Sequence, residues 1–109
     1  MTDRVTKQAS EVKVIVFACE AGMGSSLMGA NQLKKMVKKA NLPITVIHAP
    51  VHQIPPEADI ILTHKGLAGR AHQQAPAAAV VPFTMFFNDP AVKAVVDQLA
   101  AGQPVVSEF

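Results

Sequence analysis

The sequence has few features that would cross-link it, anchor it in a membrane or attach it to nucleic acid. One cysteine, Cys19, occurs in 109 residues, so an intramolecular disulfide and a zinc cluster built on cysteines are excluded. No apolar run approaches the roughly 20 residues that span a bilayer. Tryptophan and tyrosine are absent and the formal net charge is only +2, which argues against a nucleic-acid partner. We therefore expect a cytoplasmic protein.

The length and composition predict one globular domain. Half of the residues are hydrophobic and 17% are charged, which is ordinary for a folded protein. Residues 1–11 are polar and of mixed charge, unlike a signal or transit peptide. We expect a flexible lead-in over residues 1–11, the domain over 12–102 and a loose C-terminal tail over 103–109.

Apolar and amphipathic segments alternate along the domain. The run VKVIVFA from Val12 is rich in β-branched residues, which is typical of a strand buried on both faces. Further strands are expected over 44–48, 59–63 and 78–83, and helices over 27–40 and 91–101, with a short helix within 64–74. The core stripes of the two helices are Leu33, Met36, Val37, Ala40 and Val92, Val95, Val96, Leu99. This order predicts an α/β fold: a three-layer open sheet of four parallel strands with helices on both faces, Rossmann-like and similar to low-molecular-weight phosphatases.

The turn-like segment CEAGMGSS begins at Cys19, where the first strand ends. In open parallel sheets, ligands bind beyond the carboxyl ends of the strands. Gly22 and Gly24 let the backbone wrap around a ligand, and Ser25 or Ser26 would cap a helix whose N-terminus favours an anion. A phosphoryl group on the Cys19 sulfur would be held by backbone N–H groups, which also favour the nucleophilic thiolate. The competing interpretation is an inert buried thiol, which would leave this donor-rich turn unused.

A hydrolase is the alternative that shares this layout. Low-molecular-weight tyrosine phosphatases and arsenate reductases use a Cys-x5-Arg loop, in which the Arg clamps the phosphate with two hydrogen bonds. The corresponding position here is Ser25. Asp89-Pro90 resembles their general-acid loop, but the pair also fits a helix N-cap followed by proline at the first helical position. Without the Arg, we expect the phosphoryl group to be held for transfer.

The segment KVIVFACEAGMGSSLMGA, residues 13–30, resembles the phosphorylation site of the mannitol-type enzyme IIB (EIIB) domain of the bacterial phosphoenolpyruvate-dependent sugar phosphotransferase system. The resemblance continues through Ile54-Pro55-Pro56, through DIILTHKGLAGR at 59–70, and from Phe86 to Asp89. It covers most of residues 12–102. One departure is Glu20, where the mannitol type usually carries Asp, so the charge is kept on a longer side chain.

The resemblance implies a protein-phosphocysteine sugar phosphotransferase component, an enzyme of EC 2.7.1 type. Cys19 would accept a phosphoryl group from phosphohistidine on a IIA partner and pass it to a hexitol, mannitol, bound by the membrane permease IIC. The protein would associate with the inner face of the membrane through IIC and would use no metal or nucleotide cofactor. The implied phosphate-binding residues are Glu20, Ala21, Gly22, Met23, Gly24, Ser25 and Ser26. A further alternative is a regulatory EIIB-like interaction domain, which the intact cysteine disfavours.

Other polar and apolar residues are candidates for supporting roles. His64, Lys65 and Arg70 follow the third expected strand, so they would supply positive charge near the phosphate or make local loop contacts. Met23, Leu27 and Met28 would ring the loop as a docking face, with ordinary helix packing as the competing interpretation. The lysines at 34–39 are typical of a solvated face. The four histidines, at 48, 52, 64 and 72, do not follow the spacing of a metal site.

Overall fold

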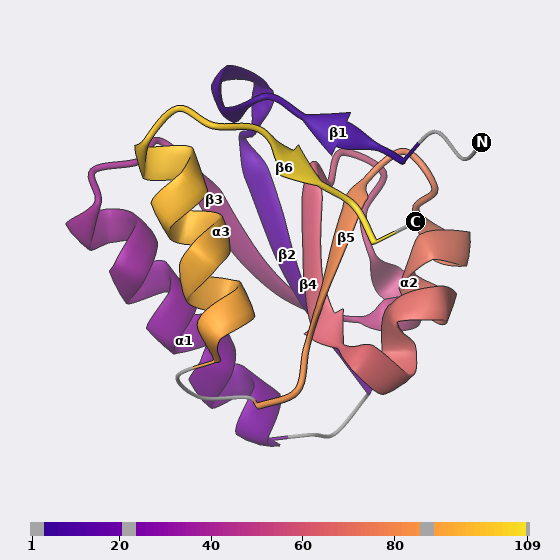
Figure 1. The fold of residues 1–109 in the computed structure, drawn as a ribbon. Coiled ribbons are helices and arrows are strands. Elements are labelled where there is room, and N and C mark those ends of the chain that lie inside the picture. Colours follow the sequence, from indigo (N-terminus) through magenta and orange to yellow (C-terminus); the bar gives the residue numbers. More distant parts are fainter. Residues whose placement is uncertain (1–3, 21–23, 86–88, 109) are drawn as a thin grey trace.

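A computed structural model describes residues 4–20, 24–85 and 89–108, and only the backbone of 24–26. Two strands lie near the chain ends, four form the main sheet, and three α-helices and three 3-10 turns connect them (Figure 1). In chain order the elements are β1 Thr6–Lys7, η1 Ala9–Glu11, β2 Val14–Cys19, α1 Gly24–Lys39, β3 Thr45–Pro50, η2 Val51–Gln53, β4 Ile60–His64, η3 Lys65–Leu67, α2 Ala68–Gln74, β5 Ala79–Phe83, α3 Pro90–Ala100 and β6 Val105–Val106.

The main sheet is parallel and has the strand order β3-β2-β4-β5. Helices α1 and α3 cover one face and α2 covers the other (Figure 1), so the predicted three-layer α/β fold is confirmed. Alternate residues of β2 enter the two cores: Ile15 and Phe17 pack on the side of α1 and α3, whereas Val16 and Ala18 pack on the side of α2. Strand β2 is therefore buried on both faces, as its apolar run predicts.

The predicted helix stripes form the core under α1 and α3. Leu33 and Val37 are buried, with Met36 and Ala40 packed against them. All four predicted residues of α3, Val92, Val95, Val96 and Leu99, are buried. The rings of Phe17 from β2 and Phe83 from β5 stack in this core with their centroids 5.0 Å apart. This adds a specific aromatic contact to the core.

Two polar side chains, one directly before β4 and one within β4, form hydrogen bonds that position β2. Asp59 Oδ2 accepts hydrogen bonds from the backbone N–H groups of Lys13 and Val14, at 2.8 and 3.0 Å. The fully buried Thr63 hydroxyl donates to the carbonyl of Ala18 at 3.0 Å. Because these bonds act at the start and near the end of β2, they fix where the strand delivers its last residue, Cys19.

Within the described residues, regular structure occurs at 6–7, 9–11 and 105–106, in segments where a flexible lead-in and a loose tail were expected. Strand β1 pairs antiparallel with β6, and the Ser107 backbone N–H donates to the carbonyl of Val5 at 2.7 Å. The buried Ser107 hydroxyl oxygen accepts from the Val80 N–H at 2.9 Å. These hydrogen bonds satisfy backbone groups beside β5. Val105 of β6 is buried in the core.

The structure also shifts the boundaries around the first turn. Cys19 is the last residue of β2, not the first residue of a loop. Helix α1 begins at Gly24, three residues before the expected start, so Ser25 and Ser26 lie in its first turn and the prediction of an N-cap at either serine is wrong. The N–H groups of this first turn have no carbonyl partner within the helix.

Candidate functional site

The Cys19 thiol lies at the carboxyl end of the central strand β2. It is a free thiol and the residue is 3% exposed. Its sulfur lies 3.3 Å from Nε2 of His48 and 3.9 Å from the carbonyl oxygen of Ala49. The first of these distances is short enough for a direct hydrogen bond between the imidazole and the sulfur. Cys19 and His48 therefore contact each other through their reactive atoms.

His48 reaches Cys19 because β2 and β3 are parallel neighbours. In their register Phe17 lies opposite His48 and Cys19 lies opposite Pro50. Side chains two residues apart share a face of a sheet, so Phe17, Cys19 and His48 all project toward α1. From the sequence, His48 is a candidate only for metal binding, and its contact with Cys19 is not predicted. A histidine near the end of the next strand was the available signal, but the sequence alone does not say which strands are neighbours.

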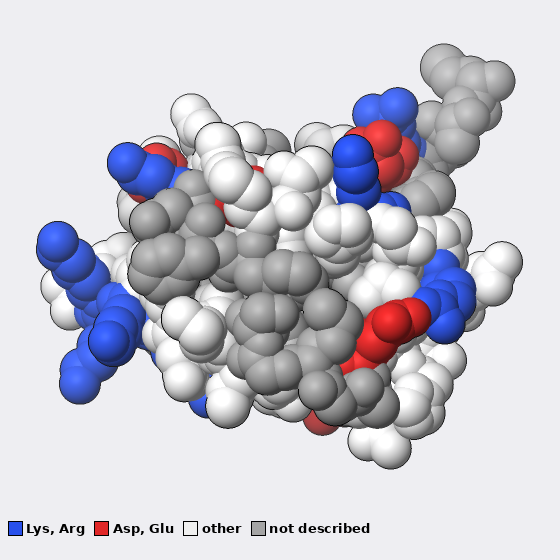
Figure 2. All heavy atoms as spheres, turned by 90° about the horizontal axis from the view of Figure 1, so that it is seen from below, with Lys and Arg blue, Asp and Glu red and all other residues white. Residues whose placement is uncertain are grey.

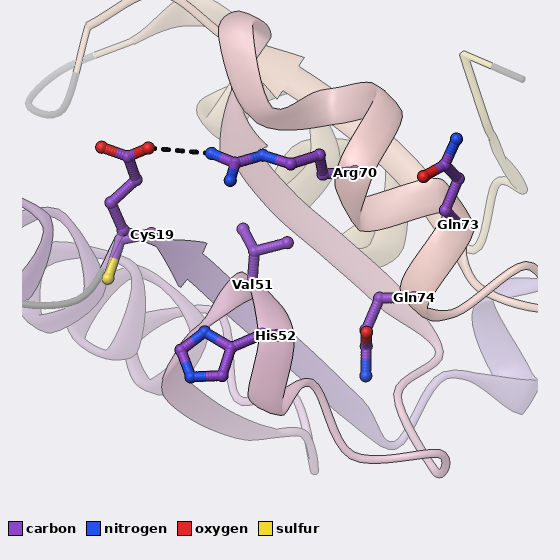
Figure 3. Close-up of a pocket in the computed structure, with 7 residues that line it drawn as sticks. Cys19, Val51, His52, Arg70, Gln73 and Gln74 are labelled. Carbon is purple, nitrogen blue, oxygen red and sulfur yellow. Dashed lines mark hydrogen bonds and ion pairs between the residues drawn. The ribbon is translucent and has the colours of Figure 1, made fainter.

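A cleft of about 500 Å³ lies beside Cys19, between η2 and α2 (Figure 3). Most of its lining residues are polar, and they come from three separate parts of the chain. The lining residues are Cys19, Glu20, Val51, His52, Arg70, Gln73 and Gln74. Arg70 donates to Glu20 Oε1 from Nη2 at 2.8 Å (Figure 3). The cleft thus brings a carboxylate, a guanidinium, an imidazole and two amides together beside residue Cys19, a set suited to polar groups.

The predicted supporting residues fall into different environments. Arg70 lines the same cleft as Cys19, which brings these two together. His64 ends β4, packs edge-on against Phe83 with ring centroids 6.3 Å apart, and accepts a hydrogen bond from the N–H of Gly66 at Nδ1. Lys65 is exposed in η3. Roles for these residues at a phosphate remain predictions. No cluster of three or more potential metal ligands occurs within residues 4–20, 24–85 and 89–108.

The predicted phosphate-binding turn is only partly visible. Ala21, Gly22 and Met23 lie outside the described residues, as do Phe86, Phe87 and Asn88 of the family-like segment. Glu20 is exposed and is bonded to Arg70. The backbone of Gly24, Ser25 and Ser26 forms the first turn of α1. Contacts of these residues with a phosphoryl group therefore remain predictions.

Large apolar side chains are exposed near the start of α1 and after β5. Leu27 and Met28 of α1 are 48% and 61% exposed, and Met85 after β5 is 50% exposed. In Figure 2, which views the molecule from below, most atoms outside the grey residues are uncharged, with lysines and arginines toward the margin and acidic side chains among them. The competing interpretation, in which Leu27 and Met28 pack as ordinary core residues of the helix, is therefore wrong. The four lysines of α1, residues 34, 35, 38 and 39, are exposed as expected of a solvated face.

Asp89 has the structural role that its sequence context predicts. Its Oδ1 accepts from the N–H of Ala91 at 2.7 Å, which caps α3. Its Oδ2 accepts from the N–H groups of Thr84 and Met85, each at 2.9 Å. Burial alone would raise the pKa of Asp89, but the hydrogen bonds from Met85, Thr84 and Ala91 outweigh it and leave the pKa lowered from 3.8. A carboxylate held ionised in this way is a poor general acid.

The ion pair between Glu20 and Arg70 is expected to contribute little to folding. The two side chains are 57% and 60% exposed, so water screens the attraction and ordering the side chains offsets it. We expect Glu20→Gln and Arg70→Gln each to change the free energy of unfolding by less than about 0.5 kcal/mol. Urea unfolding measures this, with the double variant as the control for coupling. A loss above about 2 kcal/mol would show that the pair is a structural element.

Comparisons with known proteins find one family model and several relatives. The model described as "PTS system, Lactose/Cellobiose specific IIB subunit" matches residues 14–98. The chain is 44% identical over 99 residues, 91% of its length, to a PTS system mannitol-specific EIICB component of Halalkalibacterium halodurans, and covers 21% of that protein. It is 43% identical to the corresponding component of Bacillus subtilis over 81% of its length, covering 18% of that protein.

A relative of different domain composition gives the same result. The chain is 38% identical over 91% of its length to the PTS system mannitol-specific EIICBA component of Escherichia coli, and covers 16% of it. The chain therefore spans about a fifth or less of the length of these relatives. None of the helices within the described residues is long and apolar enough to cross a membrane.

Proposed function

The chain belongs to the IIB family of the phosphotransferase system (PTS), and we propose that it is a mannitol-type phosphoryl carrier that works through Cys19. In this proposal Cys19 accepts a phosphoryl group from a phosphohistidine on a IIA protein or domain. It then passes the group to mannitol bound by a membrane IIC permease. The activity is that of a sugar phosphotransferase component.

The observation that carries the proposal is the position of the thiol. Cys19 is the single cysteine of the chain and ends the central strand β2, with α1 beginning five residues later. At such a strand end, the free N–H groups of the following helix favour an anion. The identity of 37–44% to mannitol-specific components extends across this segment, since the matches cover most of the chain.

The surrounding residues suit carrying a phosphoryl group better than hydrolysing it. Ser25 occupies the position at which low-molecular-weight phosphatases place their Arg, so the Cys-x5-Arg clamp is missing from this sequence. Asp89 is committed to capping α3 and is not placed as a general acid. In the carrier, Glu20 to Ser26 would surround the phosphoryl group, and Arg70 would compensate its negative charge. The hydrolase is therefore not retained.

The partners and the cellular placement follow from the same proposal. The relatives are named as fused EIICB and EIICBA components, so we infer a IIC permease as the acceptor-side partner and a IIA unit as the donor. The domain would then work in the cytoplasm, at the inner face of the membrane. The exposed side chains Leu27, Met28 and Met85 would contact these partners, because apolar side chains at the rim of a site favour docking.

Intact-mass measurement tests the proposal. The protein is incubated with phosphoenolpyruvate, the general PTS phosphotransferases and a mannitol-type IIA, and we expect one phosphoryl group per chain. Fragmentation under neutral conditions should place the group on Cys19. Omission of IIA is the control and should abolish the adduct. Absence of an adduct together with turnover of an aryl phosphate would overturn the proposal in favour of a hydrolase.

A further inference from the structure

The contact between Cys19 and His48 is held by the sheet itself. The two residues sit on neighbouring strands, β2 and β3, whose register is set by backbone hydrogen bonds from Val14 to Cys19. The distance from Sγ to Nε2 is 3.3 Å. Cys19 is 3% exposed and His48 is partly buried, so little water intervenes. An imidazole fixed against a thiol in this way can take its proton.

We propose that His48 is the base that activates Cys19, an inference that rests on the proposed phosphoryl-carrier function. With the ring proton on Nδ1, the Nε2 lone pair faces the sulfur, and the thiol proton passes from Sγ to Nε2. The thiolate forms the S–P bond while the N–P bond of the donor phosphohistidine breaks. The electron pair of that bond returns to the donor ring, which leaves as neutral imidazole when its other nitrogen carries a proton.

The protonated ring then has a second use. After transfer, Nε2 of His48 carries a proton and lies beside a sulfur that bears a dianionic group. A hydrogen bond from this N–H, charge-assisted on both sides, stabilises the phosphocysteine. When the phosphoryl group passes to the acceptor, the electron pair of the S–P bond stays on the Cys19 sulfur. The same N–H then stabilises the thiolate that results. One residue thus serves acceptance and release.

The charged side chains described at this end belong to other contacts or to elements away from β3. Glu20 follows Cys19 but is bonded to Arg70 of α2. Helix α1, which covers β3, has no charged side chain over residues 24–33, and its lysines begin at 34. His64 and Lys65 lie at the end of β4, which is separated from β3 by β2. His52 is exposed in η2 and lines the cleft.

The rate at which iodoacetamide alkylates the protein tests the coupling directly, because Cys19 is the single cysteine and the thiolate is the reacting form. His48→Asn and His48→Gln keep an amide for hydrogen bonding but cannot take the proton. With each rate normalised to its plateau near about pH 10, we expect wild type to react at least about tenfold faster than either variant at about pH 6.5. His72→Asn, which removes an imidazole of α2 that does not line the cleft, should keep the wild-type pH profile.

A structural contact gives a different result. If His48 only packs against the sulfur, its replacement changes the rate by the same factor at every pH, and the normalised profiles of wild type and both variants superimpose. That outcome overturns the inference. Because each profile is normalised to its own plateau, a change in exposure of the thiol does not affect the comparison.

Transfer from phosphorylated IIA separates this inference from the proposed function. With the inference correct, His48→Asn accepts the phosphoryl group at least about tenfold more slowly than wild type near neutral pH. A variant that accepts it at the wild-type rate overturns the role of His48 and leaves the carrier function intact. If wild type accepts no phosphoryl group, the carrier function fails, and the alkylation profiles still report whether His48 takes the thiol proton.

Discussion

Replacement of Cys19 by serine is expected to reduce phosphoryl transfer to mannitol by at least about a thousandfold. The hydroxyl of serine is far less acidic than a thiol, so the nucleophile is scarce at neutral pH. The product would also be a poor donor, because an alkoxide leaves phosphorus less readily than a thiolate does. The measurement is the rate of mannitol phosphate formation by membranes that contain IIC, with IIA and phosphoenolpyruvate supplied.

The loss must come from chemistry and not from unfolding. Cys19 is buried and packs at the end of β2, so a hydroxyl in place of the sulfur is expected to cost about 1 kcal/mol of stability. That cost leaves the domain folded, as thermal unfolding followed by circular dichroism should show. Cys19→Ala is the matched control, because it lacks any nucleophile at this position. A serine variant that keeps more than about a tenth of the wild-type rate contradicts the assignment of Cys19.

The parts of the fold that depend on local sequence were predictable. The apolar run at 12–18 indicates a strand buried on both faces, and its residues lie in both cores. Asp89 followed by Pro90 predicts a helix start, and the structure has that cap with proline at the first helical position. In each case neighbouring residues carry the whole signal, because burial pattern and capping act over a few residues.

The parts that depend on distant pairing were not predictable. Strands β1 and β6 have two residues each, which is too short for a pattern of alternation, and they pair across nearly the full length of the chain. The contact of His48 with Cys19 depends on β3 lying beside β2 in a particular register. A sequence shows that two strands exist, whereas the order of strands in the sheet results from how the helices pack.

The candidate site shows the same division. The sequence predicts a site at Cys19, because a thiol before a glycine-rich turn and a helix is a local pattern. It also suggests Arg70, but not that this side chain reaches Glu20 from α2 to form one wall of a cleft. The cleft is made by residues from β2, η2 and α2, so its composition appears only once those elements are assembled.

The second large effect concerns Asp89 and the stability of the fold. Its carboxylate accepts backbone hydrogen bonds from Ala91, Thr84 and Met85, and the residue is 5% exposed. Asp89→Ala removes the acceptor for all three N–H groups and the cap of α3. Because buried donors without a partner are costly, we expect a loss of about 3 kcal/mol in the free energy of unfolding. Urea unfolding at neutral pH measures it.

The pH dependence of stability distinguishes the charge of Asp89 from its shape. The pKa of Asp89 is lowered in the folded protein from 3.8, so the ionised carboxylate stabilises the fold above the unfolded-state pKa. That stabilisation is lost as the pH falls through the folded-state pKa. Asp89→Asn keeps the size of the side chain without this titration. The difference in unfolding free energy between wild type and Asp89→Asn should therefore be largest above about pH 5 and shrink toward about pH 2.

A catalytic role for Asp89 leads to the opposite pattern. If Asp89 were a general acid, Asp89→Asn would remove phosphoryl chemistry while leaving the free energy of unfolding nearly unchanged at every pH. Its oxygens instead face the start of α3 and the residues after β5, where three N–H groups would otherwise lack an acceptor. We therefore expect Asp89→Asn to lower stability and, wherever the variant remains folded, still to accept a phosphoryl group on Cys19. Since the cap and the thiol belong to different segments, measuring stability and phosphorylation on the same samples separates the two roles.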